Sequence, residues 1–178
     1  NDLKEMTKGS STLEKFEANL GTLSEIEIGT FEGCDMLNEI IIHPEIIIGM
    51  NAFQNIQNLK KISMDLQQTL RSDEFLGDNK LEEISLPLLT TIPSNLFAEL
   101  RKLKTIQLNT ASIMLQESFK NCISLENLEL PNLRNIIGDS HFEGCINLKT
   151  IDLSSLSTVH LSSSHIFGNC NQLSNIKL

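Results

Sequence analysis

Hydrophobic residues recur along the chain with a period close to 22 residues. Each repeat starts at a Phe, which is followed at +6 by Leu, at +9 by Ile or Leu, and at +11 by Ile, Met or Leu. Intervals of 22, 22, 22, 22, 23 and 25 residues separate the seven starting positions, Phe31, Phe53, Phe75, Phe97, Phe119, Phe142 and Phe167. Such a period indicates a solenoid, because one unit cannot bury its apolar face alone and neighbouring units must share a core.

The pattern within one unit predicts its local structure. The alternation in the Leu-x-x-Ile-x-Leu stretch predicts a short strand. The stretch around the Phe, as in Ser94 to Leu100, starts with a capping residue and spaces apolar residues three to four apart, which predicts one helical or 3₁₀ turn. We therefore expect an α/β leucine-rich repeat solenoid of about seven coils, with a parallel sheet on one face and short helical or 3₁₀ turns on the other.

The first 30 residues do not follow this rhythm, since Phe16 precedes Phe31 by only 15 residues. We predict an irregular N-terminal coil or cap over residues 1–30 and the solenoid over residues 31–178, in one domain overall. The apolar residues from Leu23 to Ile28 fit either the first strand of a shortened repeat or a return strand that leads into Phe31. The chain starts without Met and ends at a strand position, Leu178, so we expect it to be cut from a longer protein.

A finer pattern resembles a known family. The stretches FEGCDML (Phe31 to Leu37) and FEGCINL (Phe142 to Leu148), with Leu-Pro steps such as Leu130-Pro131, resemble the BspA-like leucine-rich repeats. The array is degenerate, because the Cys position is occupied in three coils by Ile56, Asp78 and Leu100. The resemblance implies a cell-surface or secreted protein that binds host or matrix proteins, and a cytoplasmic location stays open.

Charge and hydropathy exclude two classes of partner. Lys and Arg total 14 against 23 Asp and Glu, for a net charge of −9, and no basic run reverses this locally. Bulk attraction to nucleic acid or to an anionic membrane is therefore not expected. The longest apolar runs, such as Ile46 to Ile48, fall far short of the roughly 20 residues that cross a bilayer. We predict no nucleic-acid partner and no membrane insertion by this chain.

The residues with reactive side chains indicate no enzyme. All four cysteines lie at Phe+3 and are predicted to be free thiols buried in the core, with the last three stacked in consecutive coils; they are Cys34, Cys122, Cys145 and Cys170. No closely spaced pair of cysteines suggests a metal site, and no nucleophile or phosphate-binding motif occurs. We expect a protein without cofactor or metal.

The outward positions of the strands form the candidate partner-binding face. Along one row the charge alternates through Lys60, Glu82, Lys104, Glu126 and Lys149, which predicts a continuous ladder of opposite charges. Aromatic residues are missing from this face, so it is either a self-satisfied charged surface or a weak protein contact. The residues predicted to face a partner are Glu39, Ile41, Lys61, Ser63, Glu83, Ser85, Lys104, Gln107, Glu126, Glu129, Lys149 and Asp152.

The resemblance implies a non-catalytic protein-binding module of a BspA-like cell-surface protein, with a host, matrix or self partner. Two alternatives stay open. One is a structural or oligomerisation scaffold in which coils associate end to end or edge to edge. The other is an intracellular leucine-rich repeat module that binds a protein partner.

Overall fold

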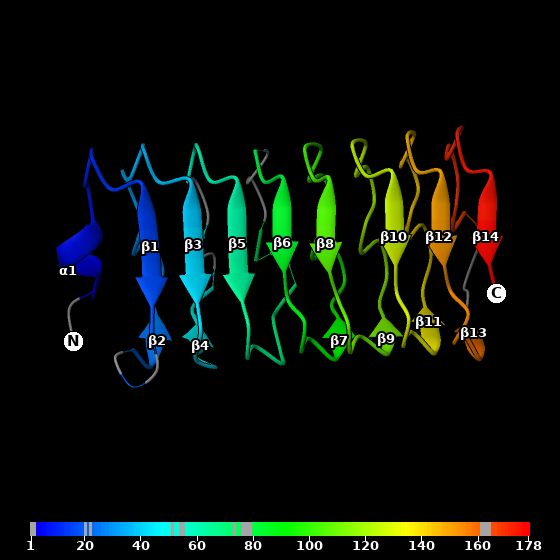
Figure 1. The fold of residues 1–178 in the computed structure, drawn as a ribbon, viewed down its shortest axis with the longest axis horizontal. Helices are drawn as coiled ribbons and strands as arrows, with labels where there is room; N and C mark the ends of the chain where they lie inside the picture. The colour runs from blue at the N-terminus through cyan, green and yellow to red at the C-terminus, as the bar shows by residue number, and fades with distance from the viewer. Residues whose placement is uncertain are drawn as a thin grey trace.

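The chain forms a parallel solenoid with one row of strands along its front. The computed structural model describes residues 3–19, 21, 23–50, 52–53, 56–72, 74–75, 80–160 and 165–178. The front strands lie side by side in chain order (Figure 1). They are β1 (Lys15–Ala18), β3 (Glu39–Ile42), β5 (Lys61–Met64), β6 (Glu83–Ser85), β8 (Thr105–Gln107), β10 (Asn127–Glu129), β12 (Thr150–Asp152) and β14 (Asn175–Lys177).

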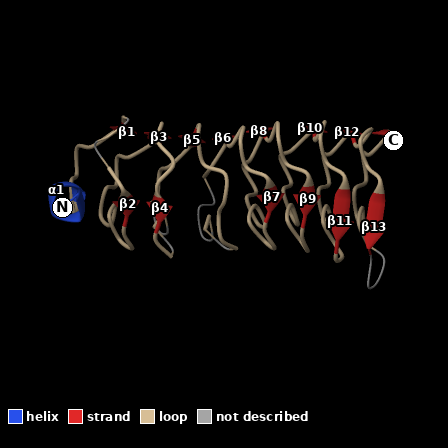
Figure 2. Ribbon diagram, turned by 90° about the horizontal axis from the view of Figure 1, so that it is seen from below, coloured by secondary structure: helices blue, strands red, loops and turns tan. Residues whose placement is uncertain are grey.

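A second row of short strands, the return strands, lies behind the front row (Figure 2). They are β2 (Glu25–Ile26), β4 (Ile47–Ile48), β7 (Thr91–Ile92), β9 (Ile113–Met114), β11 (Asn135–Ile137) and β13 (Thr158–His160). Every paired strand is parallel to its neighbour, and equivalent repeat positions are in register, as for Ile40 and Ile62. The predicted leucine-rich repeat solenoid is thus confirmed.

Both sheets are interrupted along the solenoid axis. Among the described residues, the front strands pair as β1-β3-β5-β6-β8 and, separately, as β10-β12-β14. The return strands pair as β2-β4 and as β7-β9-β11-β13. Residues 66–72, all described, form no strand between β4 and β7. Consecutive coils therefore stack throughout, but backbone pairing stops at one place on each side.

A column of phenylalanine rings fills the centre. Consecutive rings from Phe16 to Phe167 have centroids 5.0 to 6.4 Å apart, and most pairs are stacked nearly parallel. The rings from Phe31 to Phe142 are fully buried among the repeat Leu and Ile side chains. Aromatic stacking adds to the burial of apolar area, so this column contributes to the cohesion between coils.

The predicted helical or 3₁₀ turns beside each Phe are hydrogen-bonded turns instead. Within the described residues the one helix is α1 (Leu3–Thr7) at the N-terminus. The residues two before and two after Phe97 have positive φ, with Asn95 at 59° and Glu99 at 64°. A right-handed helix cannot continue through a left-handed residue, so the turn at Phe97 is confined to the few residues between these positions. Glu117 and Asn121 have positive φ at the same two positions beside Phe119.

The four cysteines are free thiols, and three of them are buried as predicted, whereas Cys170 in the last coil is half-buried. Cys122, Cys145 and Cys170 each donate a hydrogen bond to the carbonyl of the Phe one coil earlier, as Cys122 does to Phe97 at 3.1 Å. The Cys34 thiol donates to the Thr7 carbonyl at 3.0 Å. Burial raises the pKa of the Cys122 thiol, and it raises the pKa of Cys170 to about 11. Ile56 and Leu100 are buried at the same repeat position, whereas Asp78 lies outside the described residues.

The N-terminal segment joins the same sheet as the later coils. Leu13, Phe16 and Ala18 follow the Leu-x-x-Ile-x-Leu spacing, and β1 pairs with β3 in register, with Phe16 opposite Ile40. The stretch from Leu23 to Ile28 contains the return strand β2, which pairs with β4. Of the two interpretations offered by the sequence, the structure therefore shows the return strand. A search of the described residues finds no helix with the length and hydropathy that a membrane span requires.

Candidate functional site

The predicted partner-binding residues share the outward face of the front sheet. Side chains in the front strands alternate between core and solvent, as in β5, where Ile62 is buried and Lys61 is exposed. The exception is the last strand, β14, whose three residues are all exposed. Nine of the predicted residues lie within strands, and Lys104, Glu126 and Lys149 immediately precede β8, β10 and β12. We call this surface the front face.

Charges alternate across the first four front strands. Lys15, Glu39, Lys61 and Glu83 occupy register positions side by side. The carboxylate of Glu39 lies 3.6 Å from Lys15 Nζ and 3.4 Å from Lys61 Nζ, and Lys61 Nζ lies 3.8 Å from Glu83. These pairs are partly exposed, so each contributes only about 0.2 to 1 kcal/mol. Together they form an orderly charged surface at the N-terminal end of the front face.

The predicted ladder of five charges is wrong as a continuous row. Lys104 Nζ contacts Glu82 at 2.6 Å and Lys149 Nζ contacts Glu126 at 2.8 Å. In the described structure no ion pair joins Lys104 to Glu126. Strands β8 and β10 are not hydrogen-bonded to each other, and the row divides at that break. The hydrogen bond from Lys104 is the main cause of the lowered pKa of Glu82.

A histidine between two carboxylates extends the front face beyond the predicted set. The His43 ring lies after β3, with Nε2 3.5 Å from Glu17 and Nδ1 2.9 Å from Asp65. The Ser63 hydroxyl donates to the other oxygen of Asp65 at 2.9 Å. Sequence reasoning missed Glu17 and its neighbour Lys15 because β1 replaces the usual Ile and Leu by Phe and Ala. The Leu-x-x-Phe-x-Ala spacing was the available signal.

The C-terminal part of the front face is less charged. The Thr150 hydroxyl donates to Asn127 Oδ1 at 2.7 Å, and Lys177 Nζ lies 2.8 Å from Asp152. That Lys177 hydrogen bond, helped by Ser154, lowers the pKa of Asp152 to about 2. Two shallow depressions of about 250 Å³ each lie on the front face, one over β5, β6 and β8 and one over β10, β12 and β14.

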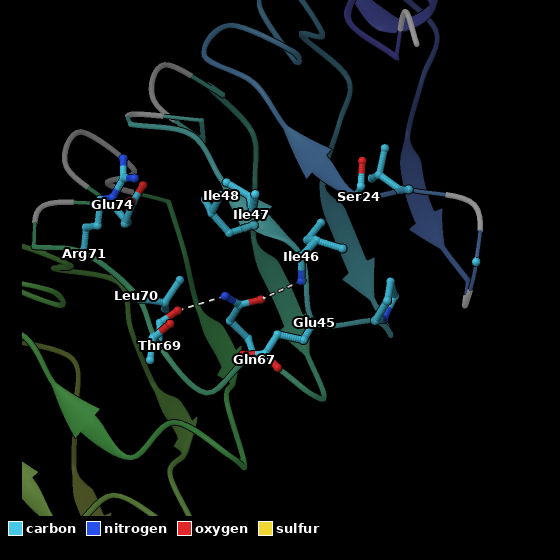
Figure 3. A pocket seen from close by; sticks show the side chains of 13 residues that line it. Ser24, Glu45, Ile46, Ile47, Ile48, Gln67, Thr69, Leu70, Arg71 and Glu74 are labelled. Atoms are coloured by element: carbon cyan, nitrogen blue, oxygen red, sulfur yellow. Dashed lines mark hydrogen bonds between the residues drawn. The ribbon is translucent and has the colours of Figure 1, made fainter.

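A larger cavity of about 780 Å³ opens on the return side, next to the missing return strand (Figure 3). The side chain of Gln67 connects two backbone segments there. Its Oε1 accepts a hydrogen bond from the Ile46 N–H at 3.3 Å, and its Nε2 donates to the Thr69 carbonyl at 2.8 Å. Glu74 also lines the cavity and is buried, and its Oε2 has no hydrogen-bond partner in the described part of the chain. Desolvation raises the pKa of Glu74 to about 7, although Arg71 opposes this shift.

The sequence contained one signal for this cavity. Glu74 occupies the position just before the repeat Phe, a core position where other coils have Thr, Ala, Leu, Ser, His or Ile. A carboxylate at a position buried in neighbouring coils indicates an unusual local environment. We name the cavity between β4 and residues 67–74 the return-side pocket.

His141 is a buried titratable residue on the turn side. Both of its ring nitrogens are buried, and in the part of the chain that the structure describes they lack a hydrogen-bond partner; burial lowers its pKa. Ser118, at the same position one coil earlier, donates its hydroxyl proton to the carbonyls of Pro93 and Leu115. The described residues contain no cluster of three or more His, Cys, Asp or Glu that could hold a metal ion.

The chain matches the model of a known protein family. The family model for the BspA type leucine-rich repeat region matches in six copies, over residues 6–114 and 90–178. No curated protein shows significant similarity to the chain.

Three solved structures share the fold. A leucine-rich repeat protein from Bacteroides ovatus superposes with a TM-score of 0.73 at 22% identity, over 95% of this chain and 50% of that protein. A leucine rich cell surface protein from Faecalibacterium prausnitzii gives 0.56 at 19%, over 93% and 59%. The T. pallidum leucine-rich repeat protein gives 0.60 at 21%, over 90% and 78%. The chain spans about half the length of the Bacteroides protein.

Proposed function

Because the chain belongs to the BspA-type leucine-rich repeat family, we propose that it is a non-catalytic protein-binding module that acts at the cell surface in adhesion to host or matrix proteins. The observation that carries the proposal is the front face, where orderly polar side chains project from a rigid parallel sheet. One structural neighbour is described as a leucine rich cell surface protein, which agrees with the proposed location.

The chemistry of the front face fits a weak contact that gains strength by repetition. It carries partly exposed ion pairs and two shallow depressions rather than a deep cleft. Trp and Tyr, which dominate strong interface positions, are absent from the sequence. Linked copies of such a module on one surface raise overall affinity without any new contact. Adhesion is a setting in which this kind of binding suffices.

The proposal is tested by binding the purified chain to a panel of immobilised matrix and plasma proteins, with serum albumin as the negative surface. The informative variant is Ser85→Arg, because Ser85 lines the depression over β5, β6 and β8 and its hydroxyl donates to Gln107 Oε1 at 3.0 Å. Its control is Ser157→Arg, an equal change at an exposed position next to the return strand β13.

We expect binding to at least one panel protein that Ser85→Arg weakens at least tenfold and that Ser157→Arg leaves intact. Loss of a single well-placed contact is commonly worth this much. Equal weakening by both variants would show that the front face is not the contact surface. Binding to none of the panel, together with concentration-dependent self-association of the chain in sedimentation equilibrium, would favour the scaffold alternative.

A further inference from the structure

The geometry points to a second binding site: we propose that the return-side pocket takes a primary alkylammonium group, either of a free amine or of a lysine side chain. The proposal does not depend on the front face or on adhesion. It rests on the size of the pocket, on its apolar wall and on a buried carboxyl group, that of Glu74, whose Oε2 has no hydrogen-bond partner among the described residues.

The pocket has the properties of a ligand site. Its volume of about 780 Å³ lies within the range that binds small organic molecules. Ile46 and Ile48 of the β4 segment are buried along one side, and Leu70 lies across from them in the close-up view (Figure 3). These side chains provide an apolar wall against which four to six methylene groups can pack.

The pocket exists because one coil lacks its return strand. In neighbouring coils this position forms β4 or β7, but Thr69 and Leu70 form no strand. The side chain of Gln67 takes over part of the missing pairing by accepting a hydrogen bond from the Ile46 N–H. The wall is therefore held in place by a side chain, and the space beside it is left open.

Glu74 sets the chemistry of the ligand. The exposed fraction of Glu74 is 2%, and its Oε2 has no hydrogen-bond partner among the described residues. Such an acceptor is costly when empty and binds a charged donor strongly when one is supplied. An ammonium group supplies both the N–H donors and the opposite charge, whereas an alcohol supplies neither charge nor more than one donor.

Two other charged groups line the pocket, and neither satisfies Glu74. Arg71 is exposed and forms no ion pair with Glu74 in the described structure, although its charge opposes the upward shift in the pKa of that group. Glu45 lies at the rim, where its side chain accepts only a long hydrogen bond from Gln68 at 3.5 Å. A carboxylate ligand would pair with Arg71 at the surface and leave Glu74 empty.

Ammonium binding requires the ionised carboxylate, so it displaces a proton from Glu74 to solvent. With a pKa of about 7 in the free protein, the ionised fraction rises about tenfold between pH 6 and pH 8. An alkylamine keeps its own positive charge over this range. The apparent affinity should therefore rise about tenfold over the same interval.

The test uses hexylamine as the probe, with 1-hexanol and hexanoate as matched molecules, in calorimetric titrations of the whole chain at pH 6 and pH 8. A lysine-containing pentapeptide provides a second arm, which separates a free amine from a side chain as the source of the group. The protein variants are Glu74→Gln and the control Glu25→Gln, which makes the same change at an exposed position on β2 outside the pocket.

We expect hexylamine to bind the unmodified chain more tightly than hexanol or hexanoate, with the stated pH dependence. Glu74→Gln should remove both the preference and the pH dependence, while Glu25→Gln keeps both. Carbon-13 detection of the Glu74 carboxyl in the unmodified chain should show its pKa falling when hexylamine is added, a result that does not rely on any variant. Equal binding of hexanol and hexylamine, or an unchanged Glu74 titration, would overturn the proposal.

Discussion

The return side of the solenoid is closed in its C-terminal half and open in its N-terminal half. From β7 to β13 the return strands form one continuous sheet, whereas β2 and β4 form a separate pair beside a coil without a strand. The front row and the phenylalanine column pass through both halves. The coils therefore stack through their Phe and Leu positions whether or not a return strand is present, and the structure of the return side differs between the two halves.

The turns beside the phenylalanines reinforce the closed half. There the Phe97 N–H donates to the Ser118 carbonyl one coil later at 3.0 Å, and the Phe119 N–H donates to His141 at 2.9 Å. Backbone hydrogen bonds of this kind tie neighbouring coils on the side opposite to the front sheet. The closed half is therefore bonded on its return and turn sides across the place where the front strands β8 and β10 do not pair, and we expect it to be the more stable part of the molecule.

The largest effect should come from the shared core. Phe97→Ala removes a fully buried ring at the boundary between the halves and should destabilise the chain by about 3 to 5 kcal/mol. Phe167→Ala, in the half-buried last ring of the column, should cost clearly less. Urea melts of both variants measure the difference, and a loss below about 1 kcal/mol for Phe97→Ala would refute the role given to the column.

The open half should respond to pH through Glu74. Its pKa is about 7 in the folded chain against 4.5 for the ordinary group, so folding favours its protonated form. Ionisation of Glu74 therefore lowers the free energy of unfolding. This destabilisation is absent below pH 4.5, grows as the pH rises to 7 and is constant above that, where it reaches at most roughly 3 kcal/mol. Glu74→Gln should thus be more stable than the unmodified chain at pH 8 and nearly equal to it at pH 4. Thermal melts across this range that show a constant difference would contradict the assignment.

Substitution of two glycines tests how tightly the turns are packed in the two halves. Gly9 and Gly144 both have positive φ, but a methyl group at Gly9 meets open space, whereas at Gly144 it would lie 2.0 Å from Asn121 Oδ1. Asn121 is held by a hydrogen bond to Glu99 in the preceding coil. Gly9→Ala should cost about 1 kcal/mol, from the backbone alone, and Gly144→Ala about 2 to 3 kcal/mol. Equal costs in denaturant melts would show that the turns are not packed as described.

The smallest effect concerns the charges of the front face. Lys61→Glu places a carboxylate between Glu39 and Glu83, while Lys104→Glu meets an ion-pair partner on one side only, at Glu82. At low ionic strength the first should cost up to about 1 kcal/mol and the second about half of that, and salt should reduce both. If Lys104→Glu destabilised the chain more than Lys61→Glu, the result would support a continuous ladder of charges and would contradict the break between β8 and β10.

The sequence was sufficient to predict the solenoid and the front face, because both follow from simple periods. Seven Phe-to-Leu units fix the stacking, and alternation within each strand assigns Lys61 and Ser63 to the surface. The turns could also have been predicted from Asn121 and Gly144, residue types that favour positive φ, at the position two after the Phe.

Two features could not be predicted, because they depend on pairing between coils. The pattern of β8 and β10 is as regular as that of their neighbours, and nothing in it indicates that these strands do not bond. The return-side pocket depends on the path of residues 67–72, a stretch without hydrophobic alternation. Only the charge of Glu74 at a core position indicated that this coil differs from the others.

The central claim, that the front face binds a protein, is tested most directly by carbodiimide labelling of exposed carboxylates in the chain, free and bound to whichever panel protein retains it. The account predicts that Glu83 and Glu126, with more than half of each side chain exposed in the free chain, become protected on binding. Glu32, on a turn away from the front strands and similarly exposed, should stay labelled. Protection of Glu32 with unchanged labelling of Glu83 and Glu126 would contradict the claim.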